Sequence, residues 1–183
     1  MTEVQDVIRE IEGDILLSRA QVIAHGIAPH DHFDTGLALA LRERWPSMVR
    51  DYRHATHDKP LAPGQIWAWS GVDADGSTRR IVNLLTQDML HGGAAAKPGK
   101  ATLENVGRAL KALARYVRDE KVRSVALPRL ATGVGGLAWS DVKPLVQQHL
   151  GDLGVPVLVY EVYRAGVQAD ESSLSEILSI DVG

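Results

Sequence analysis

The sequence predicts an α/β protein, a three-layer α/β/α sandwich with a mixed central sheet. Apolar runs typical of buried strands alternate with amphipathic helical runs, which is the pattern of a mainly parallel sheet with helices on both faces. Residues 65–70 and 80–85 are joined by a short turn and predict an antiparallel hairpin within that sheet. With 183 residues, of which 45% are hydrophobic, the chain is long enough for one well-buried domain. We expect that domain over residues 1–165 and an acidic C-terminal tail of unknown role over residues 166–183.

The composition excludes several classes of chemistry. The chain has no cysteine, so it has no disulfide, no thiolate zinc site and no cysteine nucleophile. A net charge of −3 gives no signal for tight duplex binding. The sequence has neither a signal-peptide pattern nor a long apolar span, so we expect a cytoplasmic, monomeric protein without membrane contact. Its chemistry must depend on His, Asp, Thr or the backbone.

The first two strands are predicted to bring polar residues to one edge of the sheet. Residues 7–12 favour a strand that ends at Gly13 and delivers Asp14 to that edge. Asp14 either caps the next turn or contacts a ligand. Residues 22–25 favour a central strand that is buried on both faces, with His25 near its end.

A polar loop then leads into a helix over residues 37–45, which ends at Pro46. Thr35 and Gly36 therefore mark a helix N-terminus, where unpaired N–H groups favour an anion. Asp34 is either the N-cap of this helix or a functional carboxylate. His32 belongs to a His-x-His pattern, but no third ligand is evident, and we predict neither a metal nor a cofactor.

The middle of the chain combines a loop with a structural helix. Residues 87–100 predict a long flexible loop, and Gln87 is a site candidate because it begins that loop. From residue 103 to 117, apolar residues recur every three or four positions and predict a helix capped by Thr102. In the last strand, residues 155–163, Tyr160 or Tyr163 offers a ring to a flat ligand and the other packs in the core.

A glycine-rich loop, residues 132–136, lies between a predicted strand over residues 122–127 and a helix from Ser140. Its glycines permit positive φ and leave the backbone N–H groups open to an anion. Two glycine-bearing helix N-termini at one sheet edge predict a site for two phosphates, or for a diphosphate held between them. An acid at one end and an aromatic ring near the last strand suit an adenine. These residues indicate a nucleotide-diphosphate site without a Walker lysine.

Five short motifs carry a resemblance to a known family. They are Gly13-Asp-Ile15, Val22-Ile-Ala-His25, Thr35-Gly-Leu-Ala38, Asn83-Leu-Leu-Thr86 and Leu127-Pro-Arg-Leu-Ala-Thr-Gly-Val-Gly-Gly-Leu-Ala-Trp139. In order and spacing the chain resembles the macrodomain family from about residue 7 to 163. Within that family it is most similar to the branch of the terminal ADP-ribose protein glycohydrolase and the DNA de-ADP-ribosylating antitoxins.

The resemblance implies an ADP-ribose site. Asp14 is expected to bind the adenine amine with the Ile15 backbone beside it. The two loops are expected to hold the diphosphate and the distal ribose. The expected ligand-binding residues are Asp14, Ile15, His25, Thr35, Gly36, Leu37, Ala38, Leu130, Ala131, Thr132, Gly133, Val134, Gly135, Gly136, Tyr160 and Tyr163.

Two departures from that branch affect the expected mechanism. Gln87 stands where the branch has a lysine and Gly135 where it has an aspartate, so a lysine-adduct mechanism does not carry over. The expected catalytic residues are Asp34, His32 and Gln87, with Asp34 or His32 activating water.

The expected function is hydrolysis of mono-ADP-ribose from acidic side chains of modified proteins. The alternatives are an ADP-ribose reader without turnover and an ADP-ribose phosphate phosphatase that uses His25. The expected partner is ADP-ribose or an ADP-ribosylated protein, and nucleic acid is expected only as an ADP-ribosylated substrate.

Overall fold

The computed structural model describes residues 7–89, 98–172 and 174. The strands of the main sheet are β1 (Ile8–Gly13), β2 (Val22–Ile27), β3 (Ile66–Val72), β4 (Thr78–Leu85), β7 (Val125–Pro128) and β8 (Val157–Tyr163). The helices are a 3-10 turn (Ile15–Leu17), α1 (Gly36–Arg44), α2 (Pro46–His57), α3 (Leu103–Asp119) and α4 (Trp139–Leu150). Two short strands, β5 (Gln87–Met89) and β6 (Pro98–Ala101), form a separate antiparallel pair.

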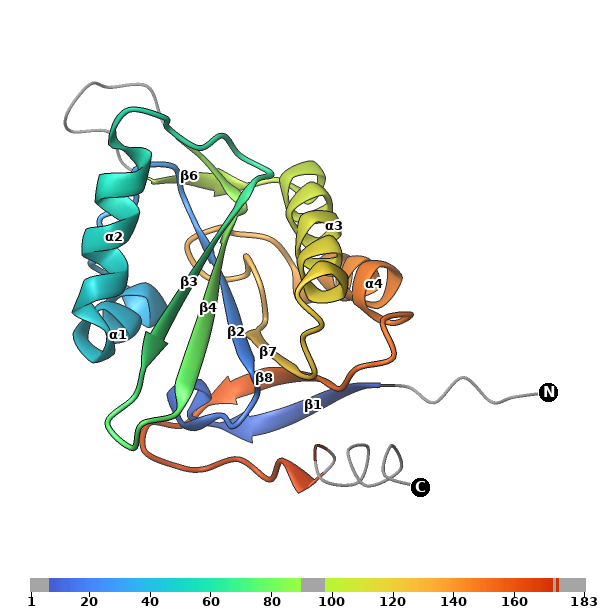
Figure 1. Cartoon of the computed structure of the whole chain (residues 1–183). Helices are drawn as coiled ribbons and strands as arrows, with labels where there is room; N and C mark the ends of the chain where they lie inside the picture. The colour runs from blue at the N-terminus through green and yellow to red at the C-terminus, as the bar shows by residue number, and fades with distance from the viewer. Residues whose placement is uncertain (1–6, 90–97, 173, 175–183) are drawn as a thin grey trace.

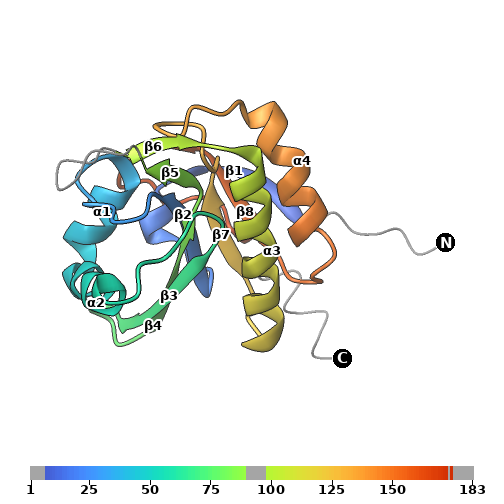
Figure 2. The same cartoon turned by 90° about the horizontal axis from the view of Figure 1, so that it is seen from above.

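The main sheet has the strand order β1-β8-β7-β2-β4-β3 (Figure 1). All neighbouring strands in it run parallel except β3, which pairs antiparallel with β4. Seen from above, α1 and α2 cover one face and α3 and α4 cover the other (Figure 2). The predicted three-layer sandwich, mixed sheet and hairpin are confirmed.

Each face of the sheet packs on its own hydrophobic core. In β2, Val22 and Ala24 belong to the cluster on the α3 and α4 side, whereas Ile23 and Ile27 belong to the cluster on the α1 and α2 side. All four residues are at most 1% exposed. Because side chains alternate along a strand, a strand covered on both faces requires the unbroken apolar run seen in the sequence.

Helix α3 forms as its sequence pattern predicts. The Thr102 Oγ1 atom accepts a hydrogen bond of 3.1 Å from the Asn105 N–H group, which satisfies one free donor of the first turn. Val106, Leu110 and Leu113 lie on the buried face and contribute to the core against the sheet and α4. Burial of each such side chain stabilises the fold by roughly 1.5–3 kcal/mol.

The predicted loop over residues 87–100 is partly wrong, because β5 and β6 begin and end it. Gly99 and Lys100 have low strand propensity, so local sequence gives little signal for β6. A tertiary contact supplies what propensity does not: the Ala101 N–H group donates to the Gly135 carbonyl at 3.0 Å. This hydrogen bond joins β6 to the glycine-rich loop.

Two of the described residues after 165 pack on the domain. Ala169 and Leu174 are 8% and 7% exposed and join the core on the α1 and α2 side. The Glu171 carboxylate accepts hydrogen bonds from the Ser18 hydroxyl at 2.7 Å and the Arg19 N–H group at 2.8 Å. Part of the predicted tail is therefore continuous with the folded unit.

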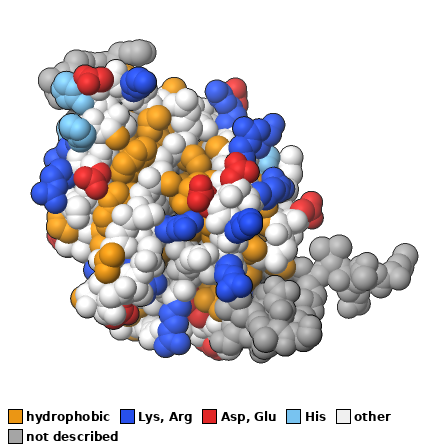
Figure 3. All heavy atoms as spheres, viewed as in Figure 1, with side chains coloured by type: hydrophobic (Ala, Val, Ile, Leu, Met, Phe, Trp, Pro, Cys, Tyr) orange, Lys and Arg blue, Asp and Glu red, His pale blue; other side chains and the backbone are white. Residues whose placement is uncertain are grey.

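The surface on the side of β3 carries charges of both signs. Figure 3 shows Lys and Arg side chains interspersed with Asp and Glu, while hydrophobic side chains gather between α2 and α3. Among the residues described here, no helix combines the length and apolarity needed to cross a bilayer.

Candidate functional site

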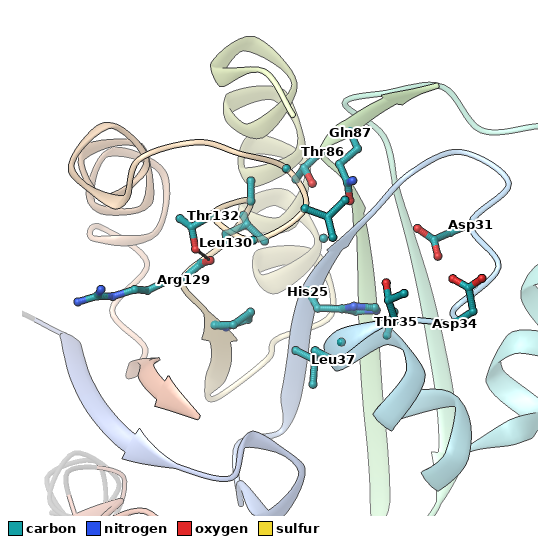
Figure 4. A pocket seen from close by; sticks show the side chains of 18 residues that line it. His25, Asp31, Asp34, Thr35, Leu37, Thr86, Gln87, Arg129, Leu130 and Thr132 are labelled. Carbon is teal, nitrogen blue, oxygen red and sulfur yellow. Dashed lines mark hydrogen bonds between the residues drawn. The ribbon is translucent and has the colours of Figure 1, made fainter. Parts of the chain in front are cut away.

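A pocket of about 280 Å³ opens at the carboxyl ends of the central strands. Its walls come from the ends of β2, β4 and β7, the start of α1 and the glycine-rich loop (Figure 4). In parallel α/β sheets this edge is where ligands bind. The lining residues are His25, Gly26, Asp31, Asp34, Thr35, Gly36, Leu37, Ala38, Thr86, Gln87, Pro128, Arg129, Leu130, Ala131, Thr132, Gly133, Val134 and Gly135.

The glycine-rich loop is shaped by its own backbone. The Gly136 N–H group donates to the Gly133 carbonyl at 3.0 Å, and the Leu137 N–H group donates to the Ala131 carbonyl at 3.0 Å. Gly136 has a φ of 77°, a conformation that glycine adopts without strain. A Cβ atom at Gly133 would meet nothing within 4 Å, so the backbone there faces open space. The loop can therefore approach a ligand closely.

The N-terminus of α1 forms the opposite wall. Its N-cap is Thr35, whose side chain makes no capping hydrogen bond, and the first turn holds no acidic residue. Gly36 has a φ of 57° and open space where a Cβ would lie. Unpaired N–H groups and the positive end of the helix dipole thus face the pocket, an arrangement that favours an anion. Because Thr35 holds the cap position, the interpretation of Asp34 as N-cap is wrong.

Asp31 folds the loop between β2 and α1. Its carboxylate accepts hydrogen bonds from the Ala28 N–H group at 3.0 Å and the Phe33 N–H group at 2.8 Å. Phe33 is fully buried at a φ of 53° and meets the Tyr52 ring edge-on, with 5.4 Å between ring centroids. This loop conformation leaves Asp34 exposed at the pocket wall. His32 is also exposed, but it does not line the pocket.

His25 lies on the floor of the pocket and is 1% exposed. Its Nε2 atom is 2.6 Å from the Asn83 Oδ1 atom. Burial lowers the pKa of His25 to about 4, although the hydrogen bond to Asn83 acts in the opposite direction. The ring is therefore neutral at physiological pH and offers a phosphate no positive charge.

Gln87 and Gly135 are the two residues that the resemblance placed where the branch is expected to have charged groups. The Gln87 side chain is tethered, because its Nε2 atom donates to the Gly99 carbonyl at 3.0 Å. A Cβ atom at Gly135 would lie 2.6 Å from the Ala131 carbonyl oxygen and 2.9 Å from the Ala101 Cβ atom. The loop as folded has no room for an aspartate at Gly135.

A second group of predicted residues gathers at the ends of β1 and β8. Gly13 pairs with Tyr163 in the register of the two strands, and Tyr163 is 56% exposed. Burial and the nearby Asp14 carboxylate raise the pKa of Tyr163. Asp14 accepts hydrogen bonds from the Leu16 N–H group at 2.9 Å and the Gly166 N–H group at 2.8 Å. An acid and an exposed ring therefore meet outside the central pocket.

These features agree with a family comparison. The Macro domain model matches residues 27–146, which is more than half of the chain. The chain belongs to the macro domain family.

Relatives of this macro domain support the assignment. A DNA ADP-ribosyl glycohydrolase from Thermus aquaticus is 28% identical over 156 residues, an alignment that covers 85% of this chain and 41% of the relative. The chain thus spans less than half of the length of that curated relative.

Two solved structures share the fold. The macrodomain of Thermus aquaticus DarG superposes with a TM-score of 0.70 at 28% identity, covering 84% of this chain and 97% of that structure. Thermosipho africanus DarTG in complex with ADP-ribose superposes with a TM-score of 0.73 at 21% identity, covering 94% of this chain and 45% of that one. The second similarity establishes the fold alone.

Most of the expected site residues of this macro domain line the central pocket; His32 and five of the expected ligand-binding residues lie elsewhere. Asp14 and Tyr163 lie at the ends of β1 and β8, and Ile15 is buried in the 3-10 turn beside them. Tyr160 is 5% exposed and its hydroxyl lies 3.1 Å from a Glu171 oxygen, so its side chain belongs to the core. Gly136 closes the glycine-rich loop.

The sequence did not single out five residues that line the pocket. These residues are Gly26, Asp31, Thr86, Pro128 and Arg129. Three of them lie within quoted motifs: Thr86 ends Asn83-Leu-Leu-Thr86, and Pro128 and Arg129 lie in the motif from Leu127 to Trp139. Within the described residues, no group of three or more His, Asp or Glu side chains could hold a metal ion.

Proposed function

We propose that this macro domain binds ADP-ribose and hydrolyses the bond that joins ADP-ribose to a modified macromolecule. The observation that carries the proposal is the pocket between two backbone surfaces, the α1 N-terminus and the glycine-rich loop. Each surface has a glycine, Gly36 or Gly133, with open space where a side chain would stand. A diphosphate fits between such surfaces without a cation from the protein.

The ends of the sheet give the bound molecule a direction. Asp14 and the exposed ring of Tyr163 lie at the ends of β1 and β8, and they suit the amine and the face of an adenine. The diphosphate then lies at the centre of the edge, beside β7 and β2. The distal ribose extends toward β4.

The hydrolysis step requires an activated water. The oxygen of water bonds to the anomeric carbon of the distal ribose, and the bond from that carbon to the acceptor breaks. The acceptor leaves with the electron pair and takes up the proton that the water loses. Asp34 is the carboxylate that we propose to receive this proton first, because it is exposed at the pocket wall and does not cap α1.

The acceptor on the substrate is proposed to be DNA. The support is the Thermus aquaticus relative, which is named a DNA ADP-ribosyl glycohydrolase. Acidic side chains of proteins are the acceptor predicted from the sequence, and they form the second arm of the test.

The experiment compares two modified substrates with the same enzyme preparation. Wild-type protein is incubated with an ADP-ribosylated oligonucleotide and with a glutamate-linked mono-ADP-ribosylated protein, and released ADP-ribose is measured by chromatography. Calorimetry with free ADP-ribose measures binding in parallel. Release from the oligonucleotide supports the proposal, and release only from the protein moves the substrate to acidic side chains. Binding without release from either substrate would make the domain a reader.

A further inference from the structure

The hydroxyl group of Thr86 is the starting point. Thr86 is 0% exposed and lies in the wall of the central pocket. Its Oγ1 atom has no hydrogen-bond partner within the described part of the chain. A buried hydroxyl without a partner destabilises the folded protein, so such groups are rare unless a ligand or water uses them.

The backbone conformation at Thr86 does not require a hydroxyl group at this position. Its N–H group already contacts two carbonyl oxygens, that of Leu84 at 2.9 Å and that of Ile27 at 3.1 Å. These bonds hold the chain in place at the end of β4 whatever the side chain is. The methyl group of threonine alone would fill the space as valine does.

Neighbouring polar side chains at this end of the sheet have protein partners. His25 is hydrogen-bonded to Asn83, and the Gln87 amide donates to the Gly99 carbonyl. Figure 4 shows Thr86, which follows β4, and Gln87, which begins β5, above His25. The hydroxyl of Thr86 therefore lacks a partner although the side chains of His25 and Gln87 each have one; the Arg129 Nε atom also lacks one.

Gly26 leaves room for this hydroxyl. A Cβ atom at Gly26 would lie 2.6 Å from the Thr86 Oγ1 atom. Because Gly26 has no side chain, the Thr86 hydroxyl can lie against its backbone, and both residues line the pocket. A methyl group there would cover the hydroxyl.

The position of Thr86 along the sheet edge indicates which part of the ligand lies beside it. In the strand order, β1 with Asp14 is followed by β8, β7, β2 and β4, so Thr86 lies four strand spacings from the adenine end, or roughly 19 Å. The ligand group at that end is the distal ribose. We propose that the Thr86 hydroxyl hydrogen-bonds a hydroxyl of the distal ribose and so distinguishes ADP-ribose from ADP. This inference rests on the proposed function.

The experiment is a comparison of two ligands that differ by the distal ribose. Calorimetry measures ADP-ribose and ADP binding to wild type, Thr86→Val and Thr86→Ser. We expect Thr86→Val to weaken ADP-ribose binding about threefold to tenfold and to leave ADP binding unchanged. The melting temperature of Thr86→Val should stay the same or rise, because the variant removes an unsatisfied hydroxyl. Thr86→Ser retains the hydroxyl and should bind ADP-ribose within about twofold of wild type.

Gly26→Ala provides a second route to the same answer. Its added methyl group covers the hydroxyl, and we expect it to weaken ADP-ribose binding more than ADP binding. Equal losses for both ligands in Thr86→Val, or a lower melting temperature in that variant, would overturn the inference alone. A wild-type protein that binds neither ligand would overturn the proposed function and this inference with it.

Discussion

The Nε2 atom of His25 lies 2.6 Å from the Oδ1 atom of Asn83, and the two residues are direct partners in the register of β2 and β4. The Asn83 amide nitrogen donates to the Trp67 carbonyl at 3.3 Å, which leaves Oδ1 as the acceptor toward the ring. Nε2 therefore carries the ring proton and Nδ1 is unprotonated. The hydrogen bond fixes one tautomer of a neutral imidazole under the pocket.

We expect His25 to make the fold sensitive to acid. Burial lowers its pKa from 6.5 to about 4, so the unfolded chain takes up a proton more readily than the folded chain. The stabilisation is fully present above pH 6.5 and is lost as the pH falls toward 4. The free energy of unfolding should fall by about 3 kcal/mol between pH 7 and pH 4 from this group. Urea unfolding at both pH values, compared with His25→Gln, isolates this contribution; equal pH dependence in both proteins would contradict it.

Asp34→Ala should separate chemistry from stability. Since Thr35 holds the cap position, loss of the exposed Asp34 carboxylate should change stability by less than about 0.5 kcal/mol. Turnover should fall at least about tenfold, with nearly unchanged affinity for ADP-ribose. Release assays, calorimetry and thermal melting measure the three quantities.

His32→Ala and Gln87→Ala are the matched controls for Asp34→Ala. His32 lies outside the pocket-lining set and should have no effect on turnover. The tethered Gln87 amide should have a smaller effect than Asp34. Normal turnover in Asp34→Ala would move the search for the base to His25 or to the ribose hydroxyls of the substrate.

Asp14→Ala should affect both binding and stability. Loss of a hydrogen bond between the carboxylate and an adenine amine should weaken ADP-ribose binding about tenfold to a hundredfold. The variant also loses the acceptor for the Leu16 and Gly166 N–H groups, which should lower stability by about 1–2 kcal/mol. Asp14→Asn keeps an acceptor oxygen and should be the more stable variant. Unchanged affinity in a folded Asp14→Ala would leave Asp14 a purely structural role.

Gly135→Asp should not create a more active enzyme. The new Cβ atom would meet the Ala131 carbonyl oxygen at 2.6 Å, and we expect a stability loss of about 1–3 kcal/mol from overpacking. Gly133→Ala is the matched control, since its Cβ would enter open space. Chemical unfolding measures the stability of the two variants. An equal loss of stability in both would show that any side chain in the loop is destabilising, whether or not it contacts the Ala131 carbonyl oxygen.

ADP-ribose binding should not depend on a divalent metal. Both phosphate-facing surfaces are backbone, and no cluster of metal-ligating side chains occurs within residues 7–89, 98–172 and 174. Calorimetry in excess chelator should give the same affinity as calorimetry with added Mg²⁺. An affinity that falls more than about tenfold in chelator, or 1.4 kcal/mol, would contradict the expectation.

Patterned segments of the fold could be predicted from sequence, and contacts between distant segments could not. The apolar run of β2 and the Thr102 cap of α3 are local signals, and both are confirmed. β6 depends on the hydrogen bond from Ala101 to Gly135, which no local pattern encodes. The packing of Ala169 is likewise a tertiary contact within a polar segment.

In the pocket, too, features encoded by local sequence could be predicted and features that depend on tertiary contacts could not. Glycines in a strand-to-helix turn predicted the loop that lines it. The unpartnered hydroxyl of Thr86 could not be predicted, because the absence of a hydrogen-bond partner can be recognised only when all the spatial neighbours of the group are known. Thr35 rather than Asp34 holds the cap position, in a loop that Asp31 holds by hydrogen bonds to the Ala28 and Phe33 N–H groups.

The close packing around Gly135 also limits which side chains this loop can accept. One of its two close neighbours is a side chain, Ala101, which a smaller residue could relieve, but the other is the backbone oxygen of Ala131. No substitution elsewhere removes a backbone oxygen, so a side chain at position 135 requires the backbone path of the loop itself to change. A carboxylate can therefore be added to this loop by a single substitution only at positions with open space, such as Gly133.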